Sequence, residues 1–291
     1  MKRIAGIIAW VLAVVVNFTA SGQGKADNKS LLWKISGKGL TKNSYLFGTM
    51  HQICPGDYVW TDKMKASLEK SDKVCFEMNM SDPNLLTQVT AGLLDLSGKK
   101  LKDYFTPDQY LHIKKYMKDS LGMDIALFEQ LKPVALESMI GLREGNCADP
   151  VSYEETIMKT AVSEHKEILG LEEAKEQLDV LETLPVDSVI KQLVDAVEHP
   201  AKDNDAEYQT MITAYKQQDI PALYELIKQS KDMGDGMDAF LDIRNKKWIP
   251  RMADKMNKSA VFFAVGAGHL WGDNGVINLL RKDGYKVEPV K

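Results

Sequence analysis

Two histidines occupy the same short pattern near opposite ends of the chain. His51 ends the segment GTMH that begins at Gly48, and His269 ends the segment GAGH that begins at Gly266. Each segment follows an apolar, strand-like run, and the chain has only five histidines. Glycine allows a sharp exit from a buried strand, which places the imidazole at the carboxyl edge where open α/β sheets bind ligands. Imidazole is a common metal ligand and a frequent general base, so the pair predicts a catalytic or metal site.

A carboxylate closes a third apolar run. Glu77 ends Val74-Cys75-Phe76, where an unpaired charge would be costly to bury, and a metal or a cationic partner would offset that cost. Two imidazoles and one carboxylate form a familiar hydrolytic metal set with open positions for water. A bound divalent metal lowers the pKa of that water. The alternative is an exposed or salt-bridged Glu77. Asn79 shares its face and could bind a ligand or hold Glu77.

Arg244 is the fourth candidate, on a long helix face shared with Trp248. A guanidinium that faces the sheet could clamp a carboxylate or stabilise an oxyanion. Without outside information, a surface ion pair is the favoured interpretation of Arg244. The chain has no HExxH, GxSxG, P-loop or GxGxxG signature. The other histidines are expected to be solvated: His112, His165 and His199.

The three cysteines allow at most one internal disulfide. Cys75 lies in an apolar run and is expected to be a buried strand residue. Cys54 and Cys147 both lie in loop-like sequence, so they are the expected pair if a bridge forms in an oxidising compartment. No cysteine or histidine spacing typical of a structural zinc site occurs.

The first residues are typical of a secretory signal peptide, residues 1–22, with Lys2 and Arg3 before an apolar run and small residues at the exit. A retained N-terminal anchor is the alternative. Cleavage before Gln23 leaves 35 basic and 41 acidic residues, so the formal net charge is −6. We expect no stable membrane anchor after this cleavage. The sequence has no basic patch of the kind that indicates nucleic-acid binding. Residues 23–30 are a polar, flexible lead-in.

Hydrophobic periodicity predicts strands at both ends and helices between them. The expected strands are 31–36, 44–47, 73–78, 167–170, 260–265 and 285–290. Helices are expected at 61–70 with Thr61 as N-cap, from 82 onward, and at 107–118, 125–131, 134–143, 153–163, 172–182, 186–198, 205–217, 221–229, 237–256 and 275–282, the last capped by Asp273 or Asn274. This pattern predicts an α+β fold: a mixed central sheet built from N- and C-terminal strands, flanked by helices, with a large helical insertion at about 105–257. Residues 31–291 are expected to form a single domain.

Several segments together resemble the TraB/GumN family, which includes TIKI-like metalloproteases and is related to erythromycin-esterase-like and ChaN-like folds. These segments are 44–51, 74–79, 169–172, 214–219, 244–245 and 263–269. The resemblance implies a divalent-metal-dependent hydrolase that uses Mn, Co or Zn. It carries metal and catalytic roles to His51, Glu77 and His269, with Arg244 as a further site residue. The chain departs from the family at Gln218, where Gly is frequent, and at Glu173, where Thr or Ser is frequent.

These observations predict an exported hydrolase, periplasmic or secreted, that acts on a peptide or small-molecule substrate and is most simply a peptidase. Either Glu77 or a histidine that is not on the metal could act as general base. One alternative is a non-catalytic haem-, metal- or peptide-binding protein on the same fold. An ester hydrolase is a further alternative, supported only by fold analogy.

Overall fold

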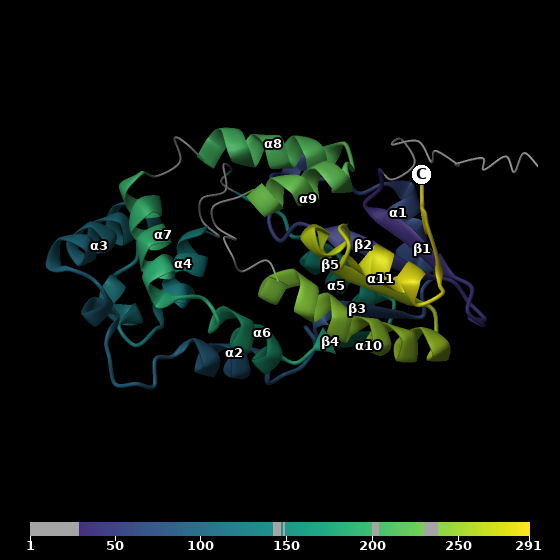
Figure 1. Cartoon of the computed structure of the whole chain (residues 1–291), viewed down its shortest axis with the longest axis horizontal. Helices are drawn as coiled ribbons and strands as arrows, with labels where there is room; N and C mark the ends of the chain where they lie inside the picture. Colours follow the sequence, from purple (N-terminus) through teal and green to yellow (C-terminus); the bar gives the residue numbers. More distant parts are fainter. Residues whose placement is uncertain (1–28, 142–146, 148, 200–203, 230–237) are drawn as a thin grey trace, which may run out of the picture.

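A six-stranded mixed sheet forms the centre of the molecule in a computed structural model, which describes residues 29–141, 147, 149–199, 204–229 and 238–291. The strands lie in the order β4-β3-β5-β2-β1-β6 (Figure 1). Their bounds are β1 Leu32–Ser36, β2 Ser44–Thr49, β3 Lys73–Met78, β4 Glu167–Glu172, β5 Val261–Gly266 and β6 Lys286–Pro289. The sheet therefore joins strands from both ends of the chain, and the predicted α+β class is confirmed. The predicted signal peptide, 1–22, lies outside the described residues.

Four adjacent strands run parallel. β3 pairs in parallel with both β4 and β5, and β5 pairs in parallel with β2, so that Thr49 lies beside Gly266. β1 pairs antiparallel with β2 and with β6. The carboxyl ends of β4, β3, β5 and β2 consequently lie along one edge of the sheet, which is where parallel sheets present ligand-binding residues.

Helices make up most of the remaining chain. They are α1 Asp62–Glu69, α2 Leu85–Leu93, α3 Pro107–Leu121, α4 Pro133–Gly141, α5 Tyr153–Ser163, α6 Ala174–Leu181, α7 Val186–Glu198, α8 Asn204–Lys216, α9 Ile220–Gln229, α10 Arg244–Lys258 and α11 Val276–Lys282. Figure 1 shows α3, α4 and α7 at the end of the molecule remote from β1 and β6. Within the described ranges, no helix is long and apolar enough to cross a lipid bilayer.

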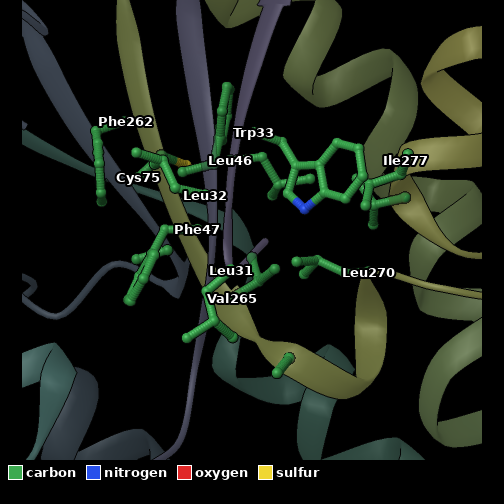
Figure 2. Packing of buried hydrophobic residues seen from close by; sticks show 14 of the residues in the cluster. Leu31, Leu32, Trp33, Leu46, Phe47, Cys75, Phe262, Val265, Leu270 and Ile277 are labelled. Carbon is green, nitrogen blue, oxygen red and sulfur yellow. The ribbon is translucent and has the colours of Figure 1, made fainter. Parts of the chain in front are cut away.

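Apolar side chains cover both faces of the sheet. Figure 2 shows Trp33 and Leu46 on the side of Ile277, and Phe47 and Phe262 on the opposite side. All five are at most 1% exposed. Strands buried on both faces read as continuous apolar runs, which is why β5 was recognisable from its sequence. This packing holds the carboxyl edge rigidly.

A few local structures differ from the sequence prediction. Thr61 caps α1 as predicted, and accepts a hydrogen bond from the Met64 N–H. Residues 125–131, predicted as a helix, contain only the short 3-10 helix Ile125–Phe128, and the next helix, α4, starts at Pro133. The N-cap of α11 is Gly275 and neither Asp273 nor Asn274. Before α10 the chain forms a π-helical turn, Asp238–Ile243.

Candidate functional site

The carboxyl edge of the parallel strands collects four ionisable residues from distant parts of the sequence. His51 follows β2, Glu77 lies near the end of β3, and Glu172 ends β4. His269 ends the 3-10 turn Ala267–His269 directly after β5. Three of these were predicted as site residues, and Glu172 was not. Arg244, the first residue of α10, reaches this edge from the face of the sheet.

Arg244 is the centre of a buried ion network. Its Nη2 donates to Glu77 Oε2 at 2.6 Å and to Glu172 Oε1 at 2.5 Å, and its Nε donates to the same Glu172 carboxylate at 3.1 and 3.2 Å. The Trp248 indole N–H donates to Glu172 Oε2 at 3.0 Å. The guanidinium also lies 4.9 Å from the Trp248 ring. The side chains of Arg244 and Glu172 are only 8% and 2% exposed, so this pair is protected from solvent screening.

His269 is buried behind Arg244. Its Nδ1 lies 2.7 Å from Asn245 Oδ1, and its Nε2 lies 3.2 Å from Arg244 Nη1. Its ring packs on Trp248 with a centroid distance of 4.4 Å. Burial lowers the pKa of His269 to about 3; Glu77 opposes the shift and the charge of Arg244 adds to it. The ring is therefore neutral at physiological pH.

Glu77 connects this network to the space in front of the sheet. Its Oε1 accepts from the Gly266 backbone N–H at 2.8 Å, and its Oε2 accepts from Gln177 as well as from Arg244. Burial favours the neutral acid, but the neighbouring positive charge of Arg244 and the Gly266 hydrogen bond help to hold the pKa of Glu77 below its usual value. Glu77 is thus a carboxylate with a fixed orientation.

His51 makes a separate contact on the outer side of the site. Its Nδ1 lies 3.1 Å from Glu154 Oε1. That carboxylate also accepts from the hydroxyls of Thr49 at 2.7 Å and Ser152 at 3.0 Å. The hydrogen bond to Glu154 raises the pKa of His51 above its ordinary value, and the negative charge of Glu154 adds to the shift. The His51 side chain is 67% exposed and that of Glu154 is 14% exposed, so a largely buried carboxylate orients an accessible imidazole.

A cavity of about 410 Å³ opens onto these groups. Its polar lining includes His51, Glu77, Glu154 and Gln177. Its apolar lining consists of Phe76, Met78, Met80, Leu85, Pro150, Val151 and Ala264. His269 and Arg244 are not among the lining residues. The site therefore has two layers: a cavity-lining layer of His51, Glu154 and Glu77, and a buried layer of Arg244, Glu172 and His269.

The two glycines and Asn79 have different positions. A Cβ on Gly48 would lie 3.0 Å from a Leu270 methyl and 3.1 Å from the Ala267 Cα, so the absent side chain lets the end of β2 pack against the turn after β5. Gly266 supplies the N–H that binds Glu77. Asn79 forms a local turn instead: its Oδ1 accepts from the N–H and hydroxyl of Ser81.

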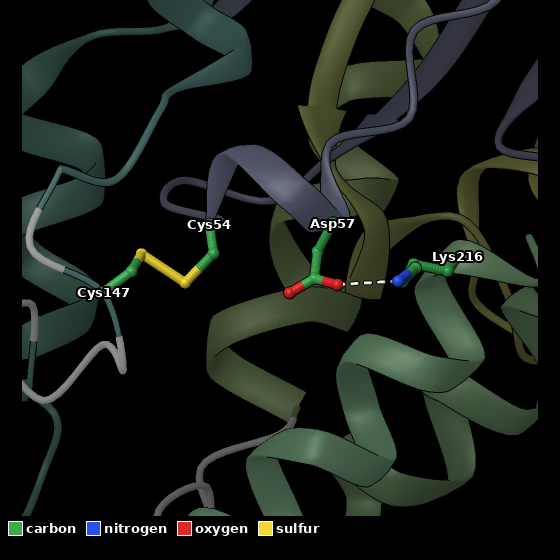
Figure 3. The surroundings of a disulfide bond; sticks show 4 residues. All are labelled: Cys54, Asp57, Cys147 and Lys216. Carbon is green, nitrogen blue, oxygen red and sulfur yellow. Dashed lines mark hydrogen bonds and ion pairs between the residues drawn. A yellow bond between two sulfur atoms is a disulfide. The ribbon is translucent and has the colours of Figure 1, made fainter.

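A disulfide joins the His51 loop to the segment that precedes Glu154. Cys54 and Cys147, the expected pair, are bonded with their Cα atoms 5.8 Å apart (Figure 3). Ile53 and Val151 exchange backbone hydrogen bonds of 3.0 and 2.8 Å between the same segments. The disulfide and the backbone hydrogen bonds thus link the segment that contains His51 to the segment that contains Glu154.

The predicted metal set is not assembled in a form that holds an ion. No group of three His, Cys, Asp or Glu side chains in the described part of the chain is arranged to bind a metal. The nearest approach between two predicted ligands is 3.8 Å, from His269 Nε2 to Glu77 Oε1, and Arg244 contacts both residues. Because Arg244 already uses His269 Nε2 and Glu77, and His51 is bonded to Glu154, these three residues as arranged here do not fit a divalent metal.

Sequence reasoning missed two acidic residues of the site. Glu172 lies just beyond the strand predicted to end at residue 170, and its signal was the same as that of Glu77: a carboxylate that closes a parallel strand. Glu154 lies in the first turn of α5, where an acidic residue is ordinarily explained by the helix dipole. Only the folded chain places Glu154 beside His51.

The fold and site define an α+β protein with a histidine- and carboxylate-lined cavity at the edge of a parallel sheet. Residues 31–289 match the TraB/PrgY/gumN family, and the chain belongs to that family. The resemblance predicted from the sequence is confirmed. No solved structure matches the chain significantly.

Curated relatives carry the name metalloprotease. Metalloprotease TIKI1 of Danio rerio is 25% identical over 345 residues, which cover 97% of this chain and 69% of the relative. Metalloprotease TIKI1 of Homo sapiens is 23% identical over 323 residues, covering 91% and 62%. The metalloprotease TIKI homolog of Amphimedon queenslandica is 23% identical over 342 residues, covering 97% and 66%. The second and third of these alignments span less than two thirds of the relative.

Proposed function

We propose that this protein is an exported, metal-dependent hydrolase that cleaves peptides. The observation that carries the proposal is the accessible imidazole of His51, held by a buried Glu154 on the wall of a cavity that also contains Glu77. Similarity to proteins named metalloproteases supports the reaction class. The disulfide between Cys54 and Cys147 supports a periplasmic or secreted location, because disulfides persist in oxidising compartments.

His51 has the surroundings of a general base. Glu154 raises the pKa of His51 to about 9, so only the fraction of rings that have lost a proton can act as a base, and kcat should rise as the pH approaches 9. In that neutral ring Nδ1–H is donated to Glu154, and the Nε2 lone pair is free to take a proton from a water molecule. That water would attack the carbonyl carbon of a bound peptide, and the imidazolium formed would return the proton to the leaving amine. Glu154 stabilises the charged ring, as the carboxylate does in other hydrolytic triads.

The cavity suits an apolar or basic peptide side chain. Its lining contains three carboxylates, Glu77, Glu154 and Glu155, and no lysine or arginine. Its apolar wall is made of methionine, leucine, phenylalanine, proline, valine and alanine side chains. An acidic side chain would meet like charges there, whereas an apolar one would be desolvated favourably.

The relatives' names also support dependence on a divalent metal: Mn, Co or Zn. The test is the purified exported chain assayed on a broad peptide library with each metal added and with a chelator. We expect metal-stimulated cleavage and retained stoichiometric metal. Neither cleavage nor retained metal would overturn the proposal. A ligand retained through purification without turnover would instead support the haem-, metal- or peptide-binding alternative.

Substitutions of the cavity-lining residues test which of them take part in the reaction. His51→Ala should lower kcat by about 10²–10⁴-fold, the usual contribution of a general base. Glu154→Gln should lower it by about 10–100-fold, because the ring loses its orienting carboxylate. His112→Ala is the matched control: His112 is exposed and pairs with Glu198 outside the proposed site, so kcat should not change.

A further inference from the structure

Glu77, Glu172 and His269 surround one cation, and that cation is a guanidinium. Arg244 Nη2 lies 2.6 Å from Glu77, its Nη1 lies 3.2 Å from His269 Nε2, and its Nε and Nη2 bind Glu172. Two carboxylates and an imidazole around one point are also what a metal ion would need. The position that these donors would offer to a metal is filled by the protein itself.

Every N–H of Arg244 has an acceptor. A guanidinium has five N–H groups in a fixed planar fork. Nε donates to Glu172, Nη1 donates to the Phe240 carbonyl and to His269, and Nη2 donates to Glu77 and Glu172. A metal at Nε2 of His269 would break one of these bonds and place a second cation beside the buried guanidinium. Arg244 likewise has no N–H left over for a substrate carboxylate.

The hydrogen bonds of His269 define which ring nitrogen is protonated. Asn245 uses its Nδ2 to donate to the carbonyls of His269 at 3.3 Å and Asn274 at 2.9 Å. Its Oδ1 therefore faces the ring and accepts from Nδ1–H. The unprotonated Nε2 accepts from Arg244. Both ring nitrogens are used inside the protein, and the side chain is 5% exposed.

We propose that the guanidinium of Arg244, and not a divalent metal, is the cation held by Glu77 and His269, and that His269 acts as a positioning residue. His269 orients Arg244, and Arg244 orients the Glu77 carboxylate that lines the cavity. The inference rests on the proposed function only in that both concern the same site. Any metal that the reaction uses is therefore bound without His269 Nε2.

The first test compares metal content in folded variants. Wild-type protein, His269→Gln and the control His112→Gln are loaded with Zn²⁺, desalted and analysed for metal, with folding checked by circular dichroism. We expect wild-type stoichiometry in both variants. A folded His269→Gln variant that has lost its metal while His112→Gln retains it would overturn the proposal.

The second test reads the protonation of the His269 ring directly, so it does not depend on enzyme activity. Nitrogen-15 NMR of the imidazole rings is recorded for the wild-type protein with and without Zn²⁺, and the His269 signals are assigned by their loss in His269→Gln. We expect a neutral ring with the proton on Nδ1 in both spectra, and no change at Nε2 when Zn²⁺ is added. A proton on Nε2, or a Zn²⁺-dependent shift confined to His269, would contradict the proposal. If wild-type protein binds no metal at all, the proposed metal dependence fails, while the ring pattern still decides the role of His269.

Discussion

At the scale of single residues, the buried layer of the site depends on charge pairing. Glu172 binds Arg244 through two nitrogens and also accepts from Trp248, with almost no exposure to water. Burying an isolated charge is far more costly than burying a hydrogen-bonded pair. Glu77 pairs only with Nη2 of Arg244, so Glu172 supplies the partner for Nε and stabilises the buried guanidinium.

Removal of Glu172 should destabilise the whole protein. Glu172→Ala leaves Arg244 buried with a missing counter-charge, and breaking a buried pair in this way costs about 3–5 kcal/mol. Urea unfolding, followed by tryptophan fluorescence, measures the change in the free energy of unfolding. The matched control is Glu176→Ala, which breaks the more exposed pair with Arg251 and should cost at most about 1 kcal/mol. An equal decrease in the free energy of unfolding in both variants would show that the buried pair contributes no more to stability than the exposed pair.

The positions of the site residues could be predicted from the sequence better than their partners could. His51, His269 and Glu77 each close an apolar strand, so their positions at one edge follow from strand pattern and parallel pairing. Their partners cannot be read in that way. The pairing of Arg244 with His269 and Glu77, instead of a metal, depends on where α10 begins and on side-chain directions that only tertiary packing fixes.

At the scale of elements, the disulfide and the bridge between Ile53 and Val151 fix the loop after β2 against the start of α5. The loop is held a second time by the ion pair of Asp57 with Lys216 on α8, at 2.7 Å (Figure 3). These contacts determine the separation of His51 from Glu154. The cysteine pair was predictable because both residues lie in loops, whereas the backbone bridge beside it has no sequence signal.

Loss of the disulfide should affect stability and catalysis together. The bonded cysteines are 93 residues apart, and removal of a bridge that closes such a loop costs about 2–5 kcal/mol. The Cys54→Ser/Cys147→Ser variant should unfold at lower urea and show a lower kcat. Wild-type protein in reducing agent should match it. Cys75→Ser is the control for thiol loss: Cys75 is buried, and burial raises the pKa of its thiol to about 12, so it does not exchange with the bridge in the native state. An unchanged unfolding midpoint in the double variant would contradict this account.

At the scale of the whole molecule, the described residues form two separate apolar clusters. The larger surrounds the sheet. The smaller lies among α3, α4 and α7 and contains Leu101, Ile113, Met117, Ile125, Leu136, Ile140, Leu193 and Val197. The helical insertion was predictable from its 3.6-residue periodicity. Its separate core was not, because periodicity identifies the apolar face of a helix but not the partner that covers that face.

The smaller cluster should open independently of the sheet. Leu136 is completely buried in it, and Leu136→Ala should cost about 2–5 kcal/mol of local packing. Native-state hydrogen exchange should then show faster exchange in α3, α4 and α7, with β2, β3 and β5 unchanged, because regions with separate cores open as separate units. Leu280→Ala, at an equally buried position in the larger cluster, is the matched control and should speed exchange in the sheet. Faster exchange throughout the molecule in Leu136→Ala would show instead that the two clusters unfold as one cooperative unit.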